Sequence, residues 1–425
     1  MLDTALQISL YVFLGLVGLG LLYYSPRLIC YFAPFKKQKH LINHEENRIL
    51  VMVPARNESS IIRGIMNCLS NQTYNKDKFD VVFIVKTNDD PTIDIAKEYG
   101  FTYLIASEQR NKEEALDICL TEYNKAQKFY DVYMVIDADC WLEKDCLSEL
   151  NNGFASSADI VTCKKMSKNY ILRGKNSGSI SGMCNGTIWP LIDELGNRFK
   201  SDHHLYQMPI TTGIAFKKSV LDATDGFKFN KTMTEDMEMM YATPLYGFKQ
   251  YYCSYSMIYM DEAESFKVTT TRRNRWLKGY VDSHRLYDAK LKKVMTSKRD
   301  RLQRYYLNGL YPTFVIYGFV TFYLFTSLLC SLAFLLTGFY SSSLICFINA
   351  LVSFSFMYIS FFIMTLFVLI VDWKKMKCPI YKRFLVLFLN PIFELDYIKV
   401  CYHALFGKQE ADWVPIERNA TVERK

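Results

Sequence analysis

The sequence of 425 residues lacks the short motifs that mark several common enzyme classes. No GxGxxG follows its first apolar run and no GxxxxGK followed by Ser or Thr occurs, which argues against dinucleotide redox chemistry and P-loop hydrolysis. HExxH and GxSxG are also missing, which argues against the common zinc proteases and serine hydrolases. The chemistry of this chain therefore has to be sought in another pattern of residues.

The 12 cysteines form no CxxC pair and no cluster with histidine. Their spacing favours neither a zinc site nor a disulfide framework, so we expect reduced, buried thiols. A large excess of one charge is missing too, because 51 basic and 43 acidic residues leave a net charge of +8. We expect no nucleic acid as a partner, since membrane topology accounts for the basic residues.

The first long uncharged run covers residues 6–24 and has roughly the ~20 residues that cross a bilayer. A cleaved signal peptide is the alternative, but no basic stretch precedes the run and no small-residue cleavage site follows it. The basic residues that come after the run are Arg27, Lys36, Lys37 and Lys39. Because cationic flanks stay in the cytosol, we expect a membrane anchor whose N-terminus lies outside.

Two further uncharged runs, residues 313–336 and 344–371, predict two more membrane spans. The loop between them carries no charge, whereas lysines and arginines precede the pair and follow it, so both outer ends are expected in the cytosol. Residues from about 30 to 305 then lie in the cytosol. This predicts a multi-pass protein of the plasma membrane with a cytosolic catalytic domain. The few spans and the lack of charge within them argue against a transporter.

Residues 384–406 are apolar, but a proline and several charged residues interrupt them. Their apolar positions recur at helical spacing, which favours a helix that lies in the membrane interface over one that crosses it. The expected organisation is a transmembrane anchor at 1–30, a cytosolic domain at 45–270, a basic segment with interfacial helices at 271–312, two transmembrane helices at 313–372, and an interfacial helix with a cytosolic tail at 380–425.

The soluble middle alternates between short apolar runs and helical patterns. Strands are expected at 49–53, 81–85, 103–105 and 132–136, and helices at 58–69, 92–98 and 112–128. This order predicts an α/β domain with parallel strands and right-handed crossovers. Such a sheet binds its ligand beyond the carboxyl ends of the strands, so the loops that open at Pro54, Lys86 and Asp137 should line one cleft.

Two acidic clusters are the strongest candidates for chemistry. Asp137 and Asp139 directly follow the last expected strand, where oxygen ligands suit Mg²⁺ or Mn²⁺ bridging a diphosphate; a solvated turn is the alternative. The second cluster, Thr234 to Glu238, also reads as the acidic first turn of a helix. Arginines surround Trp276 at 272–276, a pattern that equally suits a basic helix beside anionic lipid.

Taken together, these segments resemble the ordered motifs of family 2 glycosyltransferases. The matching segments are PARNE at 54–58, Arg110 and Lys112 before Ala115 and Leu116, DAD at 137–139, TTGIAF at 211–216, TED at 234–236 and RRNRW at 272–276. The nearest branch is that of the membrane-embedded cellulose, hyaluronan and poly-N-acetylglucosamine synthases, which Trp413 and Arg418 in the tail also resemble. Two positions differ from that pattern: Lys86 replaces an aspartate that contacts the nucleobase, and Arg272 replaces the glutamine of most polymerising members.

The resemblance implies a GT-A fold, which is Rossmann-like, and an inverting hexosyl- or N-acetylhexosaminyl-transferase. Asp236, with Glu235, would form the catalytic pair, Asp236 being the base. Asp139 and Asp137 would hold Mg²⁺ or Mn²⁺ against the departing diphosphate, beside Arg275 and Arg272. The remaining expected substrate-binding residues are Pro54, Glu58, Asp90, Lys112, Thr212, Gly213 and Trp276. Of these, Glu58 and Lys112 resemble family positions near the nucleotide, and Trp276 would face the acceptor sugar.

The expected reaction is transfer from a UDP-sugar to a growing polysaccharide at the membrane, with export as a further step. Single transfer to a lipid, as in glycolipid synthases, is the alternative, because three spans are few for lining a path for a polar polymer. Expected partners are the nucleotide-sugar donor, a polysaccharide or lipid acceptor, membrane lipids, and a second copy or an accessory export protein. A receptor that binds nucleotide sugar without turnover is a further alternative.

Overall fold

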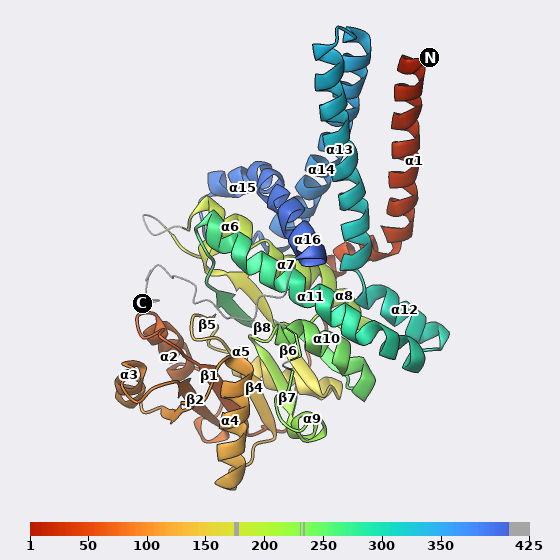
Figure 1. The fold of residues 1–425 in the computed structure, drawn as a ribbon. Coiled ribbons are helices and arrows are strands. Elements are labelled where there is room, and N and C mark those ends of the chain that lie inside the picture. The colour runs from red at the N-terminus through yellow and green to blue at the C-terminus, as the bar shows by residue number, and fades with distance from the viewer. Residues whose placement is uncertain (174–177, 230, 233, 408–425) are drawn as a thin grey trace.

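A computed structural model of the chain describes residues 1–173, 178–229, 231–232 and 234–407. Figure 1 shows a mixed α/β domain built around one sheet, with three long helices that stand out from one end of it. The predicted tail motif of Trp413 and Arg418 lies outside the described residues.

The sheet has eight strands in the order β3-β2-β1-β4-β7-β6-β8-β5. The four strands expected from the sequence pair in parallel, which confirms that expectation. The next strand, β7, runs antiparallel to β4, so the sheet is mixed rather than wholly parallel. The bounds are β1 (Ile49–Pro54), β2 (Phe79–Val85), β3 (Thr102–Ile105), β4 (Val132–Val135), β5 (Trp141–Leu142), β6 (Ile160–Ser167), β7 (Ile214–Lys217) and β8 (Gln250–Met260).

The predicted helices between the parallel strands are present as α2 (Ile62–Ser70), α3 (Thr92–Glu98) and α4 (Lys112–Lys125). α2 begins four residues later than expected because the chain first forms a loop, in which Asn57 has a φ of +58°. α4 ends three residues early, since Gln127 adopts a left-handed φ of +54° that stops a helix. The later helices of the domain are α5 (Cys146–Gly153), α6 (Ile180–Asn185), α7 (Ile188–Ile192), α8 (Arg198–Asp202), α9 (Lys218–Ala223), α10 (Glu235–Tyr246), α11 (Phe266–Val294) and α12 (Lys298–Leu307).

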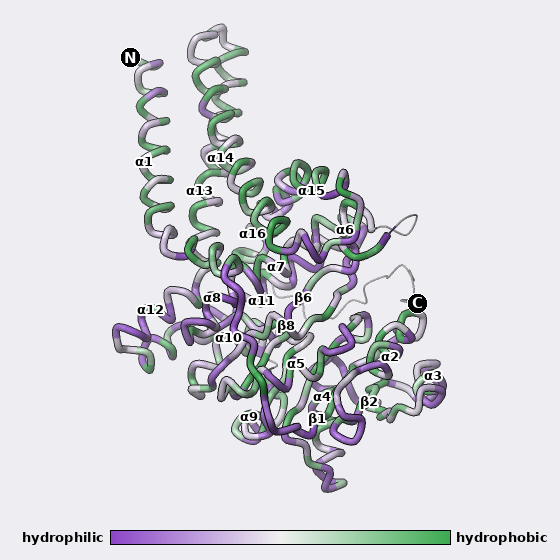
Figure 2. Tube along the Cα trace, turned by 180° about the vertical axis from the view of Figure 1, so that it is seen from behind, coloured by the Kyte–Doolittle hydropathy of each residue, from purple (hydrophilic) through white to green (hydrophobic). Residues whose placement is uncertain are grey.

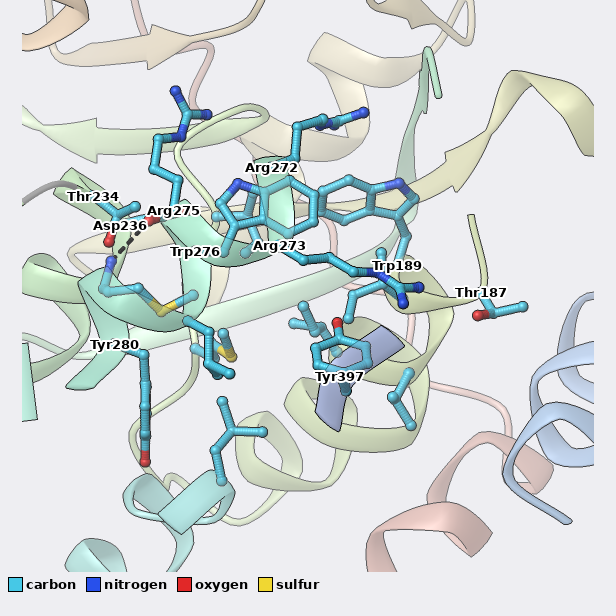
Figure 3. Close-up of a pocket in the computed structure, with 18 of the residues that line it drawn as sticks. Thr187, Trp189, Thr234, Asp236, Arg272, Arg273, Arg275, Trp276, Tyr280 and Tyr397 are labelled. Atoms are coloured by element: carbon cyan, nitrogen blue, oxygen red, sulfur yellow. Dashed lines mark hydrogen bonds between the residues drawn. The ribbon is translucent and has the colours of Figure 1, made fainter. Parts of the chain in front are cut away.

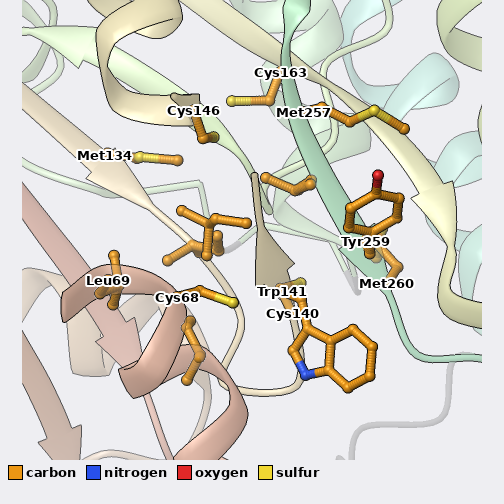
Figure 4. Close-up of a cluster of buried hydrophobic side chains, with 14 of the residues drawn as sticks. Cys68, Leu69, Met134, Cys140, Trp141, Cys146, Cys163, Met257, Tyr259 and Met260 are labelled. Carbon is orange, nitrogen blue, oxygen red and sulfur yellow. The ribbon is translucent and has the colours of Figure 1, made fainter. Parts of the chain in front are cut away.

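Two apolar cores lie on opposite faces of the sheet. Val51 of β1 belongs to one core and Leu50 to the other, as the alternation of side chains along a strand requires. Figure 4 shows part of the first core, where Trp141 packs near Cys68 of α2. All 12 cysteines are free and most are buried, which confirms the expected thiols.

Three helices are long and apolar enough to cross a membrane, as the sequence predicted: α1 (Leu2–Leu28), α13 (Leu310–Leu336) and α14 (Tyr340–Asp372). The 3₁₀ helix η1 (Ile29–Phe35) continues α1. Figure 2 shows that these helices consist mainly of hydrophobic residues, whereas the α/β domain has a mixture of hydrophobic and hydrophilic ones. The sharp turn between α13 and α14 contains Gly338, whose φ of +81° suits glycine.

The single interfacial helix expected at 384–406 is two helices, α15 (Ile380–Phe393) and α16 (Tyr397–Phe406), joined by η7 (Glu394–Asp396). The charged residues that interrupt the apolar run make contacts with α11: Glu394 pairs with Arg273 at 2.9 Å and Asp396 accepts from Thr270. These contacts explain why the expected helix is interrupted between α15 and α16, because both carboxylates contact α11 of the α/β domain. Apolar side chains of α15, including Phe384 and Phe388, are exposed, as on a helix that lies in the membrane interface. That position stays a prediction.

A buried ion-pair network ties the long helices to the sheet. Lys164 of β6 donates to Glu194 of the π-helical turn η6 (Asp193–Asn197) at 2.7 Å and to Asp372, the last residue of α14, at 2.6 Å. The side chains of all three are at most 6% exposed. Because each charge has an opposite partner, the network fixes the end of α14 against the sheet.

Candidate active site

A cavity of about 2430 Å³ lies beyond the carboxyl ends of β1 and β4 and extends to the long helices. Most of the residues singled out from the sequence line it: Pro54, Glu58, Lys112, Asp137, Asp139, Thr212, Glu235, Asp236, Arg272, Arg275 and Trp276. The fold therefore brings motifs from six distant segments to one place, as a ligand site at the strand ends requires.

Asp90 and Gly213 lie elsewhere than expected, since neither lines this cavity. Asp90 accepts a hydrogen bond from the Thr92 N–H at 2.9 Å and so stabilises the start of α3. Gly213 has a φ of +71°, and a Cβ there would meet the Ile258 side chain at 2.6 Å. Both residues therefore have structural reasons for their identity.

Lys112 links the two acidic clusters at the centre of the cavity. Its ammonium lies 2.5 Å from Asp137 Oδ1 and 3.8 Å from Glu235 Oε1. Burial lowers the pKa of Lys112, but the two carboxylates outweigh that effect and raise the pKa overall, so the side chain stays charged. Thr212 accepts from the Asp137 N–H at 2.9 Å and Thr211 donates to Glu235 at 2.7 Å. These contacts place the TTGIAF segment against both clusters.

Asp236 differs from its neighbour Glu235 in its ionisation. Burial, and then the charge of Glu235, raise the pKa of Asp236 to about 7. At Glu235 burial also raises the pKa, but Lys112, the hydrogen bond from Thr211 and Arg275 together outweigh it and lower the pKa. Both residues open α10, and Asp236 accepts from the Met237 N–H at 2.8 Å (Figure 3). Neighbouring carboxyls whose pKa values are pushed apart suit separate roles, and a value near 7 suits a general base.

The approach of α11 to this turn depends on Gly279. A Cβ at Gly279 would lie 1.9 Å from Thr234 Oγ1, so only glycine lets the helix and the acidic turn come this close. The sequence contains Gly279 just after the RRNRW segment, but nothing in the pattern indicated what it would touch. Its role follows from the packing of two segments more than 40 positions apart.

Trp189, Trp276 and Arg272 lie together in the cavity (Figure 3), and Glu262 also lines it. The Arg272 guanidinium lies 4.9 Å from the Trp276 ring centroid and 3.3 Å from Glu262 Oε2. Trp189 packs edge-on to Trp276 at 5.8 Å and donates its indole N–H to Glu262. Burial raises the pKa of Glu262 to about 7. The sequence analysis missed Trp189 and Glu262, although the acidic run after β8 was a visible signal.

Arg275 comes from the same face of α11 as Trp276 and lies near Asp236 in the cavity (Figure 3). Its Nε is buried and, among the described residues, has no hydrogen-bond partner. Its charge lowers the pKa of Asp236, an effect smaller than those of burial and Glu235 that raise it. An unpartnered guanidinium N–H at this position can receive an anionic ligand group.

The residues suited to a divalent metal are Asp137 and Asp139 at the end of β4. Across the part of the chain that the structure describes, no three His, Cys, Asp or Glu side chains gather closely enough to hold a metal ion. The two carboxylates fit Mg²⁺ or Mn²⁺ by oxygen chemistry, provided that substrate oxygens and water complete the coordination. A metal that arrives with a diphosphate meets that condition.

The far wall of the cavity is made of α1, α13, α14 and α16, and most of its side chains are apolar. It includes Leu21 and Tyr24 of α1, Phe314, Ile316, Tyr317 and Phe322 of α13, Phe356, Met357, Ile359, Met364 and Phe367 of α14, and Ile398, Leu405 and Phe406 of α16. Apolar walls suit a hydrocarbon chain and offer little to the hydroxyls of a saccharide polymer.

Comparisons with known proteins agree with this arrangement. The family described as "Glycosyltransferase like family 2" matches residues 47–279, more than half of the chain. A probable glycosyltransferase of Bacillus subtilis, YdaM, is 26% identical over 248 residues, which cover 55% of each protein. A probable glycosyltransferase of Sulfolobus acidocaldarius is 22% identical over 263 residues, 60% of this chain and 53% of that protein. The chain thus spans about half the length of these curated relatives.

One of the solved structures that the chain resembles is the mannosyltransferase PcManGT from Pyrobaculum calidifontis in complex with GDP-Man and Mn²⁺. The TM-score is 0.49 at 17% sequence identity, over 83% of this chain and 98% of that one.

Proposed function

The chain belongs to glycosyltransferase family 2, and on that premise we propose that it transfers a sugar from a nucleotide-diphosphate sugar to a lipid acceptor, with inversion at the anomeric carbon. The observation that carries the proposal is the continuity of one cavity from the acidic clusters to the apolar wall of the membrane helices. A lipid can lie along that wall while its polar end reaches the carboxylates.

The lipid acceptor replaces the growing polysaccharide that the sequence favoured. A polysaccharide needs hydrogen-bond partners along its path, because each unsatisfied polar group in an apolar environment costs several kcal/mol, on the order of 2–7. The membrane side of the cavity offers few such partners, Thr313, Thr321 and Ser360 among them. The volume of about 2430 Å³ is more than twice that of an ordinary small-molecule site and has room for a donor and a lipid together.

In the proposed reaction, Asp236 takes the proton of the acceptor hydroxyl as its oxygen attacks the anomeric carbon. The bond from that carbon to the diphosphate breaks, and the nucleoside diphosphate leaves with the bonding electrons. A base with a pKa near the working pH typically contributes ~10²–10⁴ in rate. The position of Asp236 at the start of α10, beside Glu235 and Arg275, supports this role.

The donor would bind on the sheet side of the cavity. Lys112 and Arg275 would face its phosphates, while Arg272 and Trp276 would face the acceptor end. Mg²⁺ or Mn²⁺ held by Asp139 and Asp137 would supply positive charge to the leaving diphosphate. A UDP-sugar is the proposed donor. This choice rests on the family resemblance alone, because Asp90, one of the expected substrate-binding residues, stabilises α3 and does not line the cavity.

The proposed location is the cytosolic face of the plasma membrane. It rests on the basic flanks of the three apolar helices, including the exposed Lys36 and Lys37 after α1. Nucleotide sugars are soluble, charged molecules, so a site on the cytosolic side gives the donor direct access.

The test is to incubate the full chain in detergent with a panel of nucleotide sugars, Mg²⁺ or Mn²⁺, and a membrane lipid extract. We expect one discrete product that partitions into butanol, with nucleoside diphosphate released in equal amount. A ladder of long water-soluble chains would support polymer synthesis instead. Donor binding with neither product would identify a receptor that does not turn over. The same incubation is repeated with Asp236→Asn, which removes the proposed base. Asp94→Asn, which changes an exposed carboxylate on α3, is its matched control.

A further inference from the structure

Arg27 lies in the last turn of α1 and points into the cavity. Only 6% of it is exposed, and its guanidinium stacks 3.6 Å from the Tyr305 ring centroid. One amine, Nη2, donates to the Tyr305 carbonyl, whereas Nε and Nη1 are buried and have no partner among the described residues. Two buried guanidinium nitrogens, which together carry three N–H bonds, are therefore left without an acceptor among the described residues, which is costly unless a ligand supplies one.

Lys200 of α8 lines the same cavity and adds a second positive charge. Within the described ranges, neither Arg27 nor Lys200 forms an ion pair with a carboxylate. The pKa of Lys200 falls to about 8, chiefly because burial disfavours its charge, with a further contribution from Arg27. The two side chains thus form a cationic site inside the protein.

The surroundings of this site resemble a lipid headgroup region more than a sugar site. Tyr24 and Leu28 in the last turns of α1 and Leu310 and Thr313 in the first turn of α13 line the cavity, where these helices adjoin the α/β domain. Lys36 and Lys37, which follow in the sequence, are exposed, so the general basic flank of the anchor does not account for the inward direction of Arg27. A cation that is kept inside a membrane helix without a carboxylate is a default candidate for a functional site.

We propose that Arg27 and Lys200 bind the phosphate group of an anionic lipid whose chain lies against the apolar wall of α1, α13 and α14. Guanidinium N–H groups match phosphate oxygens in pairs, and an ammonium adds charge without directional demand. That this lipid is the acceptor rests on the proposed function, whereas its binding does not. The site lies on the membrane side of the cavity, apart from the acidic clusters that would receive the donor.

The test measures binding to the full chain in neutral detergent with three probes: dioctanoyl phosphatidic acid, dioctanoylglycerol and inorganic phosphate. We expect phosphatidic acid to bind and to raise the unfolding temperature, and the other two to bind at least tenfold more weakly, because the site needs both the phosphate and the chains. Arg27→Gln should weaken phosphatidic acid binding by about tenfold or more, as loss of a charge-assisted pair does.

Lys37→Gln is the matched control, since it removes one exposed cation from the same basic flank. Equal loss of binding in Lys37→Gln and Arg27→Gln would show a general attraction to charge and would overturn the site. Equal binding of inorganic phosphate and phosphatidic acid would overturn the lipid source. Should Arg27→Gln fail to fold, Lys200→Met provides the same comparison, with the same loss expected.

The two proposals fail in different ways. If Arg27→Gln loses phosphatidic acid but the wild-type chain makes no lipid-soluble product, the site stands and the acceptor assignment falls. If the chain makes such a product and Arg27→Gln makes it with an unchanged KM for lipid, the transferase stands and the cationic site is wrong.

Discussion

The molecule contains two groups of buried charged residues that differ in whether they have partners within the protein. Behind the sheet, Lys164 is fully paired with Glu194 and Asp372. Around the cavity, Arg27 keeps two guanidinium nitrogens without a partner among the described residues, and Asp236 has a pKa of about 7. Because burying a charge is expensive unless it is paired, the ion pairs account for the first group, whereas the second group suits a ligand or a reaction.

The largest effect is expected where a cavity charge takes part in the reaction. Asp236→Asn should reduce transfer by about 10²–10⁴, because the acceptor proton then has no base, while nucleoside diphosphate binding stays within about twofold. Product formation and calorimetric titration with nucleoside diphosphate measure the two effects. Loss of both transfer and nucleoside diphosphate binding would mean that Asp236 holds the donor. The unfolding temperature of Asp236→Asn should change little, unlike that of a variant of Lys164.

Breaking the paired group should affect stability instead. Lys164→Met removes the cation that both buried carboxylates contact directly and should lower the free energy of unfolding by about 3–5 kcal/mol. Denaturant or thermal unfolding in detergent measures the change. The triple change Lys164→Met, Glu194→Gln and Asp372→Asn should recover part of the loss, since no unpaired charge remains. A single variant as stable as wild type would show that the network does not hold α14 to the sheet.

The packing between α11 and the acidic turn should matter for activity more than for stability. Gly279→Ala forces Thr234 to move, and a displacement on the order of 1 Å near the reacting groups can cost about 10²-fold in rate. Gly15→Ala is the control, because its Cβ would meet nothing within 4 Å on α1. Steady-state transfer rates of both variants decide the matter, and equal activity would contradict the contact.

The ionisation of Asp236 predicts the pH dependence of the reaction. The base must be deprotonated, so kcat/KM should rise with pH through about 7 and fall about tenfold for each unit below it. Glu262 has a pKa of about 7 as well, so the profile of Glu262→Gln separates the two groups. If the acidic limb disappears in Glu262→Gln, then Glu262 carries it and Asp236 does not.

The smallest expected effect is a change in stability whose sign is opposite to that of Lys164→Met. Arg27→Gln, measured without anionic lipid, should leave stability unchanged or raise it by about 1 kcal/mol, because the change removes an unpartnered buried cation. Lys164→Met acts in the opposite direction. Unfolding curves of the two variants, recorded in the same neutral detergent, test this difference. A strong loss of stability in Arg27→Gln would place Arg27 in the structural group.

Much of the α/β domain could be predicted because each strand and helix carries its own local pattern. The apolar run at β1 and the helical spacing in α4 place those elements within a few residues. The errors lie where the local pattern is silent. α4 ends at Lys125, two residues before the left-handed Gln127, and β7 runs antiparallel to β4, starting opposite Val135 at the carboxyl end of that strand. No local pattern specifies strand direction in such a pair.

The candidate site shows the same division. Asp137, Glu235 and Arg275 stand in recognisable motifs, so the sequence indicated that they belong together. Trp189 and Glu262 stand in no motif and became visible only through their hydrogen bond and their packing against Trp276. Asp90 looked like a ligand residue in the sequence, yet its carboxylate is used by the first turn of α3.

By itself the sequence determined the family, the three apolar helices and the identity of the acidic and basic motifs, because these depend on residue types and spacings along the chain. Only the tertiary structure decided which buried charges are paired, since pairing joins residues such as Lys164 and Asp372 that are about 200 positions apart. It also decided that Arg27 faces the cavity while Lys36 and Lys37 face outward. In the sequence these three cations look alike, and only their burial in the folded chain distinguishes the cavity residue from the two surface residues.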